Sequence, residues 1–170
     1  MKVVLKRIGY SLTVALVITG CGVNGHSHGK WPAAVVQTEN LTEMQKDLVF
    51  ETLKDLNTQI RRTVVNPEQA GDAYPITIKL HGKWAEAPSR AGYATVADDR
   101  CLVELSDEIF QDDKKDFLKP VIWHEFGHCA GLNHDPREGE IMYRTSSTMQ
   151  DYQAPAINRF FSAILSSAGL

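Results

Sequence analysis

Three histidines and a glutamate lie close together in this 170-residue chain, at spacings that suit a metal site. His124 and His128 are four residues apart, and on an α-helix that spacing puts both rings on one face, about 40° apart around the axis. Two imidazoles one turn apart can bind a single Zn²⁺ ion. Glu125 is rotated about 100° from the first ligand, so its carboxylate reaches toward a bound water rather than toward the metal.

A glycine after the second histidine allows a third ligand to join from outside the helix. Gly131 comes three residues after His128, where a glycine can adopt the left-handed conformation that ends a helix. The chain then turns back, and His134 can supply a third imidazole. Three neutral imidazoles leave one zinc position open for a water, whose pKa the metal lowers toward 7. Glu125 can accept the proton of that water and pass it to a leaving amine, so we expect one catalytic zinc ion.

The complete pattern resembles the long zinc motif of the metzincin metallopeptidases. It reads His124-Glu125-x-x-His128-x-x-Gly131-x-x-His134. That family also has a methionine turn downstream, and residues 140–143 (Glu-Ile-Met-Tyr) lie at a suitable distance. The resemblance implies a zinc endopeptidase that acts on a peptide or protein substrate, with Glu125 as general base and Met142 as an apolar floor under the histidines.

The residues around the motif leave the branch of the family open. Tyr143 adjoins Met142, as in the matrixin-like members, and Asp135 follows the third histidine, as in the adamalysin-like members. A different class of function is a non-catalytic, zinc-containing binding lipoprotein of the cell envelope. A closed structural zinc site would have a fourth protein ligand, so three histidines beside Glu125 favour the enzyme.

The first 21 residues differ in composition from the rest of the chain. Three basic residues precede a mostly apolar run, residues 8–19, which is too short to span a membrane. This pattern is typical of a secretory signal peptide. Residues 18–21 (Ile-Thr-Gly-Cys) resemble a bacterial lipobox, in which Cys21 would be lipidated after cleavage; a plain signal peptide with an incidental cysteine is the alternative.

We therefore expect three parts in the chain. They are a signal peptide over residues 1–20, a flexible tether over residues 21–31 and a single catalytic domain over residues 32–170. Removal of the signal peptide leaves 15 basic and 21 acidic residues, a net charge of −6, which disfavours nucleic acid as a partner. We expect an exported monomer that is attached to a bacterial membrane of the cell envelope only through a lipid on Cys21.

The other two cysteines, Cys101 and Cys129, are candidates for a disulfide. In an exported chain such a pair favours a bridge, with two buried free thiols as the alternative. Helical geometry puts Cys129 on the face opposite His124 and His128, toward the core and away from the metal. A bridge would close a loop of about 28 residues and contribute about 3–4 kcal/mol to stability.

Hydrophobic periodicity predicts an α+β fold. The expected elements are strands at residues 33–37, 75–80, 91–97 and 100–106, and helices at residues 41–62 (capped by Thr38 or Asn40), from Asp116 or Pro120 to Gly131, and 154–166. By resemblance to the metzincins, we expect a twisted, mostly parallel sheet with an antiparallel edge strand over the active-site helix. A small C-terminal subdomain would hold the methionine turn and the final helix. The resemblance also places residues 100–106 at the sheet edge beside the cleft, where they could pair with an extended substrate.

Overall fold

The computed structural model describes residues 16–17, 34–66 and 74–168. Outside these ranges lie Cys21, the expected tether over residues 21–31 and nearly all of the expected signal peptide over residues 1–20. Within the described ranges, no helix has both the length and the apolar composition of a membrane span. The lipidation of Cys21 and the boundaries of the three expected parts thus stay predictions.

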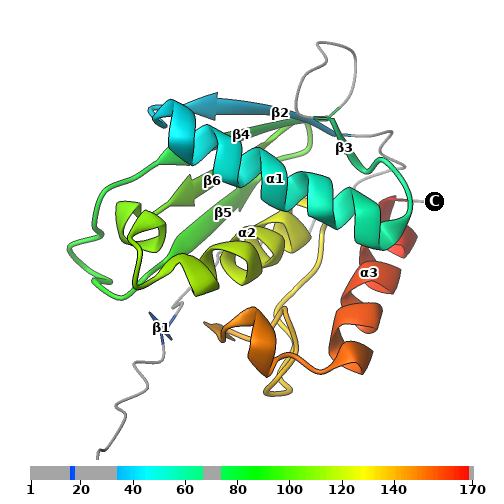
Figure 1. Ribbon diagram of the computed structural model, residues 1–170. Coiled ribbons are helices and arrows are strands. Elements are labelled where there is room, and N and C mark those ends of the chain that lie inside the picture. Colours follow the sequence, from blue (N-terminus) through cyan, green and yellow to red (C-terminus); the bar gives the residue numbers. More distant parts are fainter. Residues whose placement is uncertain (1–15, 18–33, 67–73, 169–170) are drawn as a thin grey trace, which may run out of the picture.

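A five-stranded sheet forms one layer of the fold (Figure 1). Its strands are β2 (Ala34–Glu39), β3 (Val65–Asn66), β4 (Pro75–Leu80), β5 (Gly92–Val96) and β6 (Cys101–Leu105). They lie in the order β3-β2-β4-β6-β5, and all neighbours are parallel except β5 and β6, which are antiparallel. The prediction of a mostly parallel sheet with one antiparallel edge strand is confirmed.

The antiparallel edge strand is β5, so the expectation that residues 100–106 form the edge is wrong. β6 lies between β4 and β5 and pairs with both. No residue of β6 is exposed, whereas Thr95 of β5 is exposed. A strand with little exposure on either face suits an inner position in a parallel sheet. Residues 81–91 therefore carry the chain past this position to the outer edge before it returns as β6.

The long helix α1 (Glu43–Ile60) packs against this sheet, and its start differs from the prediction. Thr42, rather than Thr38 or Asn40, is the capping residue. The backbone N–H of residue 45, a glutamine, donates to the Thr42 hydroxyl at 3.3 Å, and the side chain of that glutamine accepts from the Thr42 N–H at 2.9 Å. Asn40 instead turns the chain with a φ of +60°, a left-handed conformation that asparagine tolerates.

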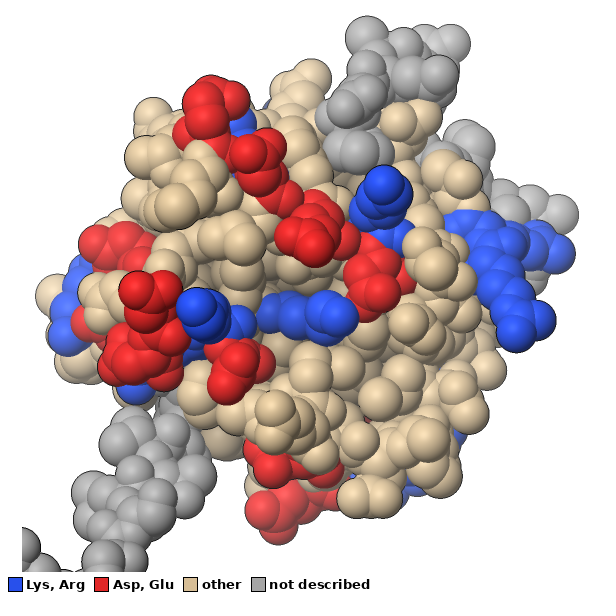
Figure 2. Space-filling model, in the orientation of Figure 1, with Lys and Arg blue, Asp and Glu red and all other residues tan. Residues whose placement is uncertain are grey.

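The second long helix, α2 (Lys115–Cys129), carries the zinc motif and lies beside α1 on the same side of the sheet (Figure 1). The indole N–H of Trp123 donates to the carbonyl of Thr52 in α1 at 3.3 Å. Lys119 pairs with Asp55 across the two helices at 2.7 Å. On the face that Figure 2 shows, acidic and basic side chains are interspersed over these two helices.

Short elements lie outside the main sheet and the long helices. They include β1 (Leu16–Val17) and the 3₁₀ turns η1 (Asp107–Phe110) and η2 (Met149–Asp151).

The chain after α2 forms a smaller unit, residues 130–168, which we call the lower part; residues 34–129 are the upper part. The lower part contains η2, the strand β7 (Thr145–Ser146), which pairs with β1, and the final helix α3 (Ala154–Ala168). Phe160 and Phe161 of α3 pack on Trp123, with ring centroids 6.2 and 5.2 Å away. The predicted C-terminal subdomain with a final helix is confirmed (Figure 1).

The predicted disulfide between Cys101 and Cys129 is present, with a sequence separation of 28. It joins β6 to the last turn of α2, and both cysteines are buried. Cys129 thus faces the sheet, as helical geometry predicts, and the alternative of two free thiols is wrong. The bridge holds the end of the motif helix where the chain leaves it toward the lower part.

Candidate metal centre

The motif helix is buried on nearly all sides because it lies between the sheet and the lower part. Every residue from 120 to 129 is buried, including the polar side chains of His124, Glu125 and His128, each of which is 0% exposed. Burial of polar groups is costly unless they find partners. Three such residues within five positions of a core helix therefore call for a chemical explanation beyond packing.

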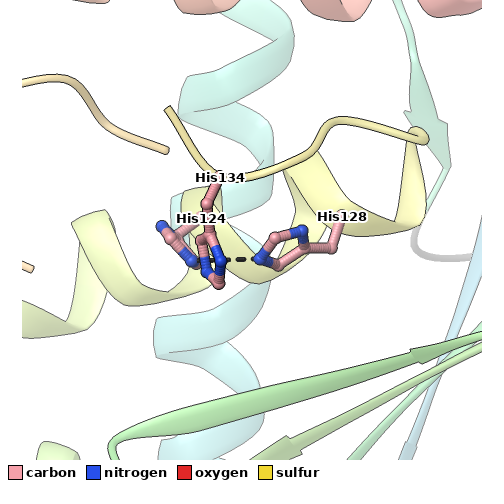
Figure 3. Close-up of side chains that lie close together, drawn as sticks. All are labelled: His124, His128 and His134. Carbon is pink, nitrogen blue, oxygen red and sulfur yellow. Dashed lines mark hydrogen bonds between the residues drawn. The ribbon is translucent and has the colours of Figure 1, made fainter. Parts of the chain in front are cut away.

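Backbone carbonyl groups fix the orientation of both helical histidines. His124 Nδ1 lies 2.7 Å from the carbonyl oxygen of Ile141, and His128 Nδ1 lies 2.8 Å from that of Leu132. A carbonyl oxygen can only accept, so each Nδ1 carries the proton and donates it. The two Nε2 atoms then present lone pairs to each other at 3.1 Å (Figure 3). Such a pair of acceptors indicates a site built for a cation.

The third histidine reaches the same point from the loop after the helix. Gly131 takes the expected left-handed conformation, with a φ of +86°, and the Leu132 N–H donates to the carbonyl of Gly127 at 2.9 Å. The ring of His134 then lies 5.2 and 4.7 Å, between centroids, from the rings of His124 and His128. Its Nε2 is buried and has no hydrogen-bond partner among the described residues.

The three imidazoles fit a zinc ion. One ligand nitrogen from each of His124, His128 and His134 lies within 4.8 Å of the other two. Two nitrogens that share a tetrahedral zinc at 2.0–2.1 Å are about 3.3 Å apart, close to the 3.1 Å between the two helical Nε2 atoms. Among the described residues, no carboxylate or thiolate joins this cluster as a fourth ligand.

Burial keeps these rings neutral, as metal binding requires. Desolvation, with the neighbouring His128 ring as the next cause, lowers the pKa of His124 from 6.5 to about 3. Desolvation likewise lowers the pKa of His128 to about 4. The pKa of His134 is lowered by burial and, second, by the charge of Arg144. At neutral pH all three rings therefore offer a lone pair to a metal without first losing a proton.

Glu125 lies next to the edge strand, a position that the sequence did not predict. A Cβ atom placed on Gly92, the first residue of β5, would lie 2.7 Å from Glu125 Oε1 and 2.8 Å from its Cγ. Only glycine leaves room for the carboxylate at this point. Gly92 is thus a further residue of the site, and its signal in the sequence is a glycine at the start of a strand, which can mark a close approach.

Met142 lies beneath the motif helix, as the resemblance implies. It is 6% exposed, and a Cβ on Gly127 would lie 2.5 Å from its sulfur. The carbonyl of Met142 accepts from the Asp135 N–H at 2.9 Å, and the preceding residue, Ile141, holds His124. The methionine turn therefore positions one candidate ligand, His124, through the carbonyl of Ile141, and it holds the segment after His134 through the hydrogen bond to Asp135.

Charged side chains stabilise this turn, and of these the sequence analysis singled out only Asp135. Glu140 is buried and pairs with Arg159 of α3, whose Nε lies 3.1 Å from the carboxylate. Arg137 donates to Asp135 from both its side chain and its backbone, which lowers the pKa of that carboxyl to about 2. Arg159 had only a weak signal, a single cation among the apolar residues of the last helix.

A family model and two solved structures are similar to this chain. Residues 35–158 match the family model described as Matrixin. Archaemetzincin from Methanopyrus kandleri is similar in fold, with 12% identity, a TM-score of 0.52 and coverage of 85% of this chain and 97% of that chain. Metalloproteinase-II from Bacteroides fragilis has 14% identity and a TM-score of 0.44, over 80% of this chain and 54% of that chain. No curated protein sequence matches the chain.

Proposed function

Because this chain belongs to the matrixin family, a group of zinc metallopeptidases of the metzincin type, we propose that it is an endopeptidase with Glu125 as its general base. One zinc ion would be held by His124, His128 and His134. The observation that carries the proposal is the convergence of three neutral imidazoles beside a fully buried carboxylate. The absence of a fourth ligand from the described part of the chain supports an open, catalytic site over a closed, structural one.

The residues of the chain would divide the work of hydrolysis. Zinc, when bound, polarises the scissile carbonyl and lowers the pKa of the attacking water. The Nδ1–H groups of His124 and His128 donate to backbone carbonyls, which holds the rings in place and makes Nε2 a better ligand. Glu125 accepts the proton of the attacking water and delivers it to the nitrogen of the leaving amine, so no serine or cysteine nucleophile is required.

The edge strand supports a peptide as the substrate. β5 pairs with β6 on one side, and no described strand pairs with its other side. An extended peptide can add to such an edge through backbone hydrogen bonds. Gly92 at the start of β5 contacts Glu125, so a peptide on this edge would run past the general base.

We also propose that the protein is exported and lipidated on Cys21, with residues 32–170 as the catalytic domain. The charged start, the apolar run and the lipobox-like residues 18–21 support this. Cleavage before Cys21 would remove β1, and with it the short pairing of β1 with β7. Mass spectrometry of the mature N-terminus tests the proposal. An unmodified N-terminus at another position would reject it.

The proposed activity is tested with a broad library of peptides, because the substrate is unknown. We expect cleavage that stops when a chelator removes the metal and returns when one equivalent of zinc is added. Replacement of His81, which stacks on Trp84 with centroids 4.4 Å apart and is not part of the cluster, serves as the control. The His81→Ala protein should behave like the wild type. Cleavage that survives complete removal of zinc would reject the proposed function.

A further inference from the structure

A cavity of about 240 Å³ lies directly beside the metal centre, and we call it the side cavity. It is lined by His134, Asp135, Pro136, Tyr143 and Arg144. The segments that follow His134 and Met142 border it together because the Asp135 N–H donates to the Met142 carbonyl at 2.9 Å. A chemical group in the side cavity would therefore contact a metal-binding histidine.

The two charged residues of the side cavity differ in how their charges are balanced. Asp135 accepts from Nε of Arg137 at 2.9 Å and from its terminal nitrogen at 2.6 Å, so its negative charge is neutralised. Arg144 is exposed, and none of the ion pairs among the described residues includes it. The side cavity thus carries one uncompensated positive charge.

A second cavity beside the same loop differs from the side cavity in that its charges are paired. It has a volume of about 280 Å³ and lies toward α3, with His134, Glu140 and Arg159 among its lining residues. There the carboxylate of Glu140 pairs with Arg159, and Arg137 lies 3.9 Å from the same carboxylate. The charges of this second cavity are satisfied within the protein. Of these two cavities, the side cavity is the one that offers a cation to a ligand.

We propose that Arg144 determines specificity by binding a carboxylate of the substrate in the side cavity. The substrate class is a peptide with Asp or Glu at a position that flanks the scissile bond, or with its C-terminal carboxylate there. This inference rests on the proposed function, because it assumes that the scissile bond is cleaved at the histidine cluster.

The size and chemistry of the side cavity suit such a group. Its volume is below the roughly 300–1,000 Å³ of sites for drug-sized ligands, so it fits one side chain rather than an extended molecule. A guanidinium matches a carboxylate in shape and can donate two parallel hydrogen bonds. An apolar substrate side chain would instead leave the charge of Arg144 beside apolar surface, which is unfavourable.

Pairs of peptides that differ only in Glu and Gln test the proposal. The pair is placed at each position that flanks the cleaved bond, with free and amidated C-termini. We expect the wild type to prefer Glu at one of these positions by about tenfold in kcat/KM. If the C-terminal carboxylate is the ligand, the preference should follow the free terminus instead. Arg144→Gln should abolish the preference, and Arg144→Glu should reverse it toward Lys.

A control and a binding measurement separate this role from general damage to the fold. Arg62, an exposed arginine after α1, does not line the side cavity, so Arg62→Glu makes the same change of charge and should keep the wild-type preference. The affinity of the uncleaved peptides is measured on the zinc-loaded Glu125→Gln protein, alone and combined with Arg144→Gln. The Glu peptide should bind about tenfold more tightly only when Arg144 is present.

The outcomes distinguish the two proposals. Zinc-dependent cleavage with equal rates for Glu and Gln peptides and for free and amidated termini would overturn the role of Arg144 and leave the proposed function intact. A preference that persists unchanged in Arg144→Gln would overturn it as well. Absence of any zinc-dependent cleavage would overturn the proposed function, and this inference with it.

Discussion

The metal centre takes its ligands from two regions that are held together in different ways. The upper part supplies two histidines and the proposed general base from α2, a helix packed between the sheet and the lower part and tied to β6 by the disulfide. The lower part supplies His134 from a loop. Polar contacts fix that loop, chiefly the bond from the Asp135 N–H to Met142 and the pairing of Glu140 with Arg159.

This difference indicates that the upper part holds its two histidines in position before a metal binds, and that His134 of the lower part then completes the site. Burial of apolar side chains contributes about 25 cal/mol for each Å² removed from water, which favours a rigid upper part. Ion pairs that involve a half-exposed arginine such as Arg159, whose side chain is 49% exposed, contribute much less. A metal that binds only the folded state raises the free energy of unfolding by mass action. Phe160 and Phe161 also pack on Trp123 across the two parts, so we expect zinc to add a tie at the metal site to the apolar packing that already joins them.

Loss of a zinc ligand should have the largest effect, whichever part supplies it. Structural zinc sites with four ligands bind zinc with a free energy of about 10–16 kcal/mol, so the loss of one ligand should lower the zinc affinity by roughly 10²–10³-fold. We expect this loss in His128→Ala, from the upper part, and in His134→Ala, from the lower part. Titration of the metal-free proteins with zinc measures it, with His81→Ala as the control. Wild-type zinc affinity in His134→Ala would show that the lower part does not take part in the site.

Removal of the disulfide should weaken the upper part without emptying the metal site. The bridge closes a loop of 28 residues, which corresponds to about 3–4 kcal/mol of unfolding free energy. Neither cysteine belongs to the histidine cluster, so the Cys101→Ala, Cys129→Ala double variant should still bind one zinc ion. Denaturant unfolding with and without zinc measures both effects. An unchanged unfolding midpoint would contradict the role assigned to the bridge.

Acid should destabilise the metal-free protein through the histidines of the upper part. In the folded state the pKa values of His124 and His128 are about 3 and 4, below the ordinary value of 6.5 in the unfolded chain. The unfolded state thus binds more protons in this window. The contribution of these rings is fully present above pH 6.5 and is lost as the pH falls toward 4.

We expect the free energy of unfolding to fall by about 5 kcal/mol between pH 6.5 and pH 4, with a slope that corresponds to nearly two protons. Unfolding of the chelator-treated protein across this range measures it. The slope should fall by about one proton in His124→Asn, which cannot titrate. A stability that does not change over this range would mean that the rings are solvated in the metal-free protein.

Two glycine substitutions should affect different regions of the site, one the proposed general base and the other the lower part. In Gly92→Ala the new methyl group would meet the carboxylate of Glu125, so we expect about 10²-fold slower turnover with unchanged zinc content. In Gly127→Ala it would meet Met142 and push the lower part from α2, so we expect weaker zinc binding. Gly82→Ala is the control, because nothing lies within 4 Å of its new Cβ. Equal zinc loss in both variants would contradict the division into two parts.

The sequence predicted those features that depend on local spacing. The strand over residues 75–80 has the predicted bounds, and the helical spacing of His124 and His128 brings their Nε2 atoms together. Helical geometry likewise placed Cys129 toward the sheet and the disulfide. The directions of these side chains are determined by residues within a few positions of one another, whereas the bridge itself joins residues 28 positions apart and was predicted from a pair of cysteines in an exported chain.

The features that the sequence did not predict depend on contacts between distant segments. The position of β6 inside the sheet follows from the path of residues 81–91, which carry no signal of which edge they reach. The contact of Gly92 with Glu125 and the pairing of Glu140 with Arg159 join residues that lie 33 and 19 positions apart. No periodicity reports such pairs, so only the folded structure identifies these residues as parts of the site.

The variant Glu125→Gln is the sharpest test of whether the histidine cluster and Glu125 form a catalytic zinc site. The amide is nearly the same size as the carboxylate, and Glu125 is not a member of the ligand cluster. The measurement is zinc content together with the rate of peptide cleavage in the same preparation. We predict one equivalent of zinc, unchanged folding and turnover that is about 10²–10⁴-fold slower, because the amide cannot accept a proton. A variant that keeps both its zinc and the wild-type rate of cleavage would contradict the account.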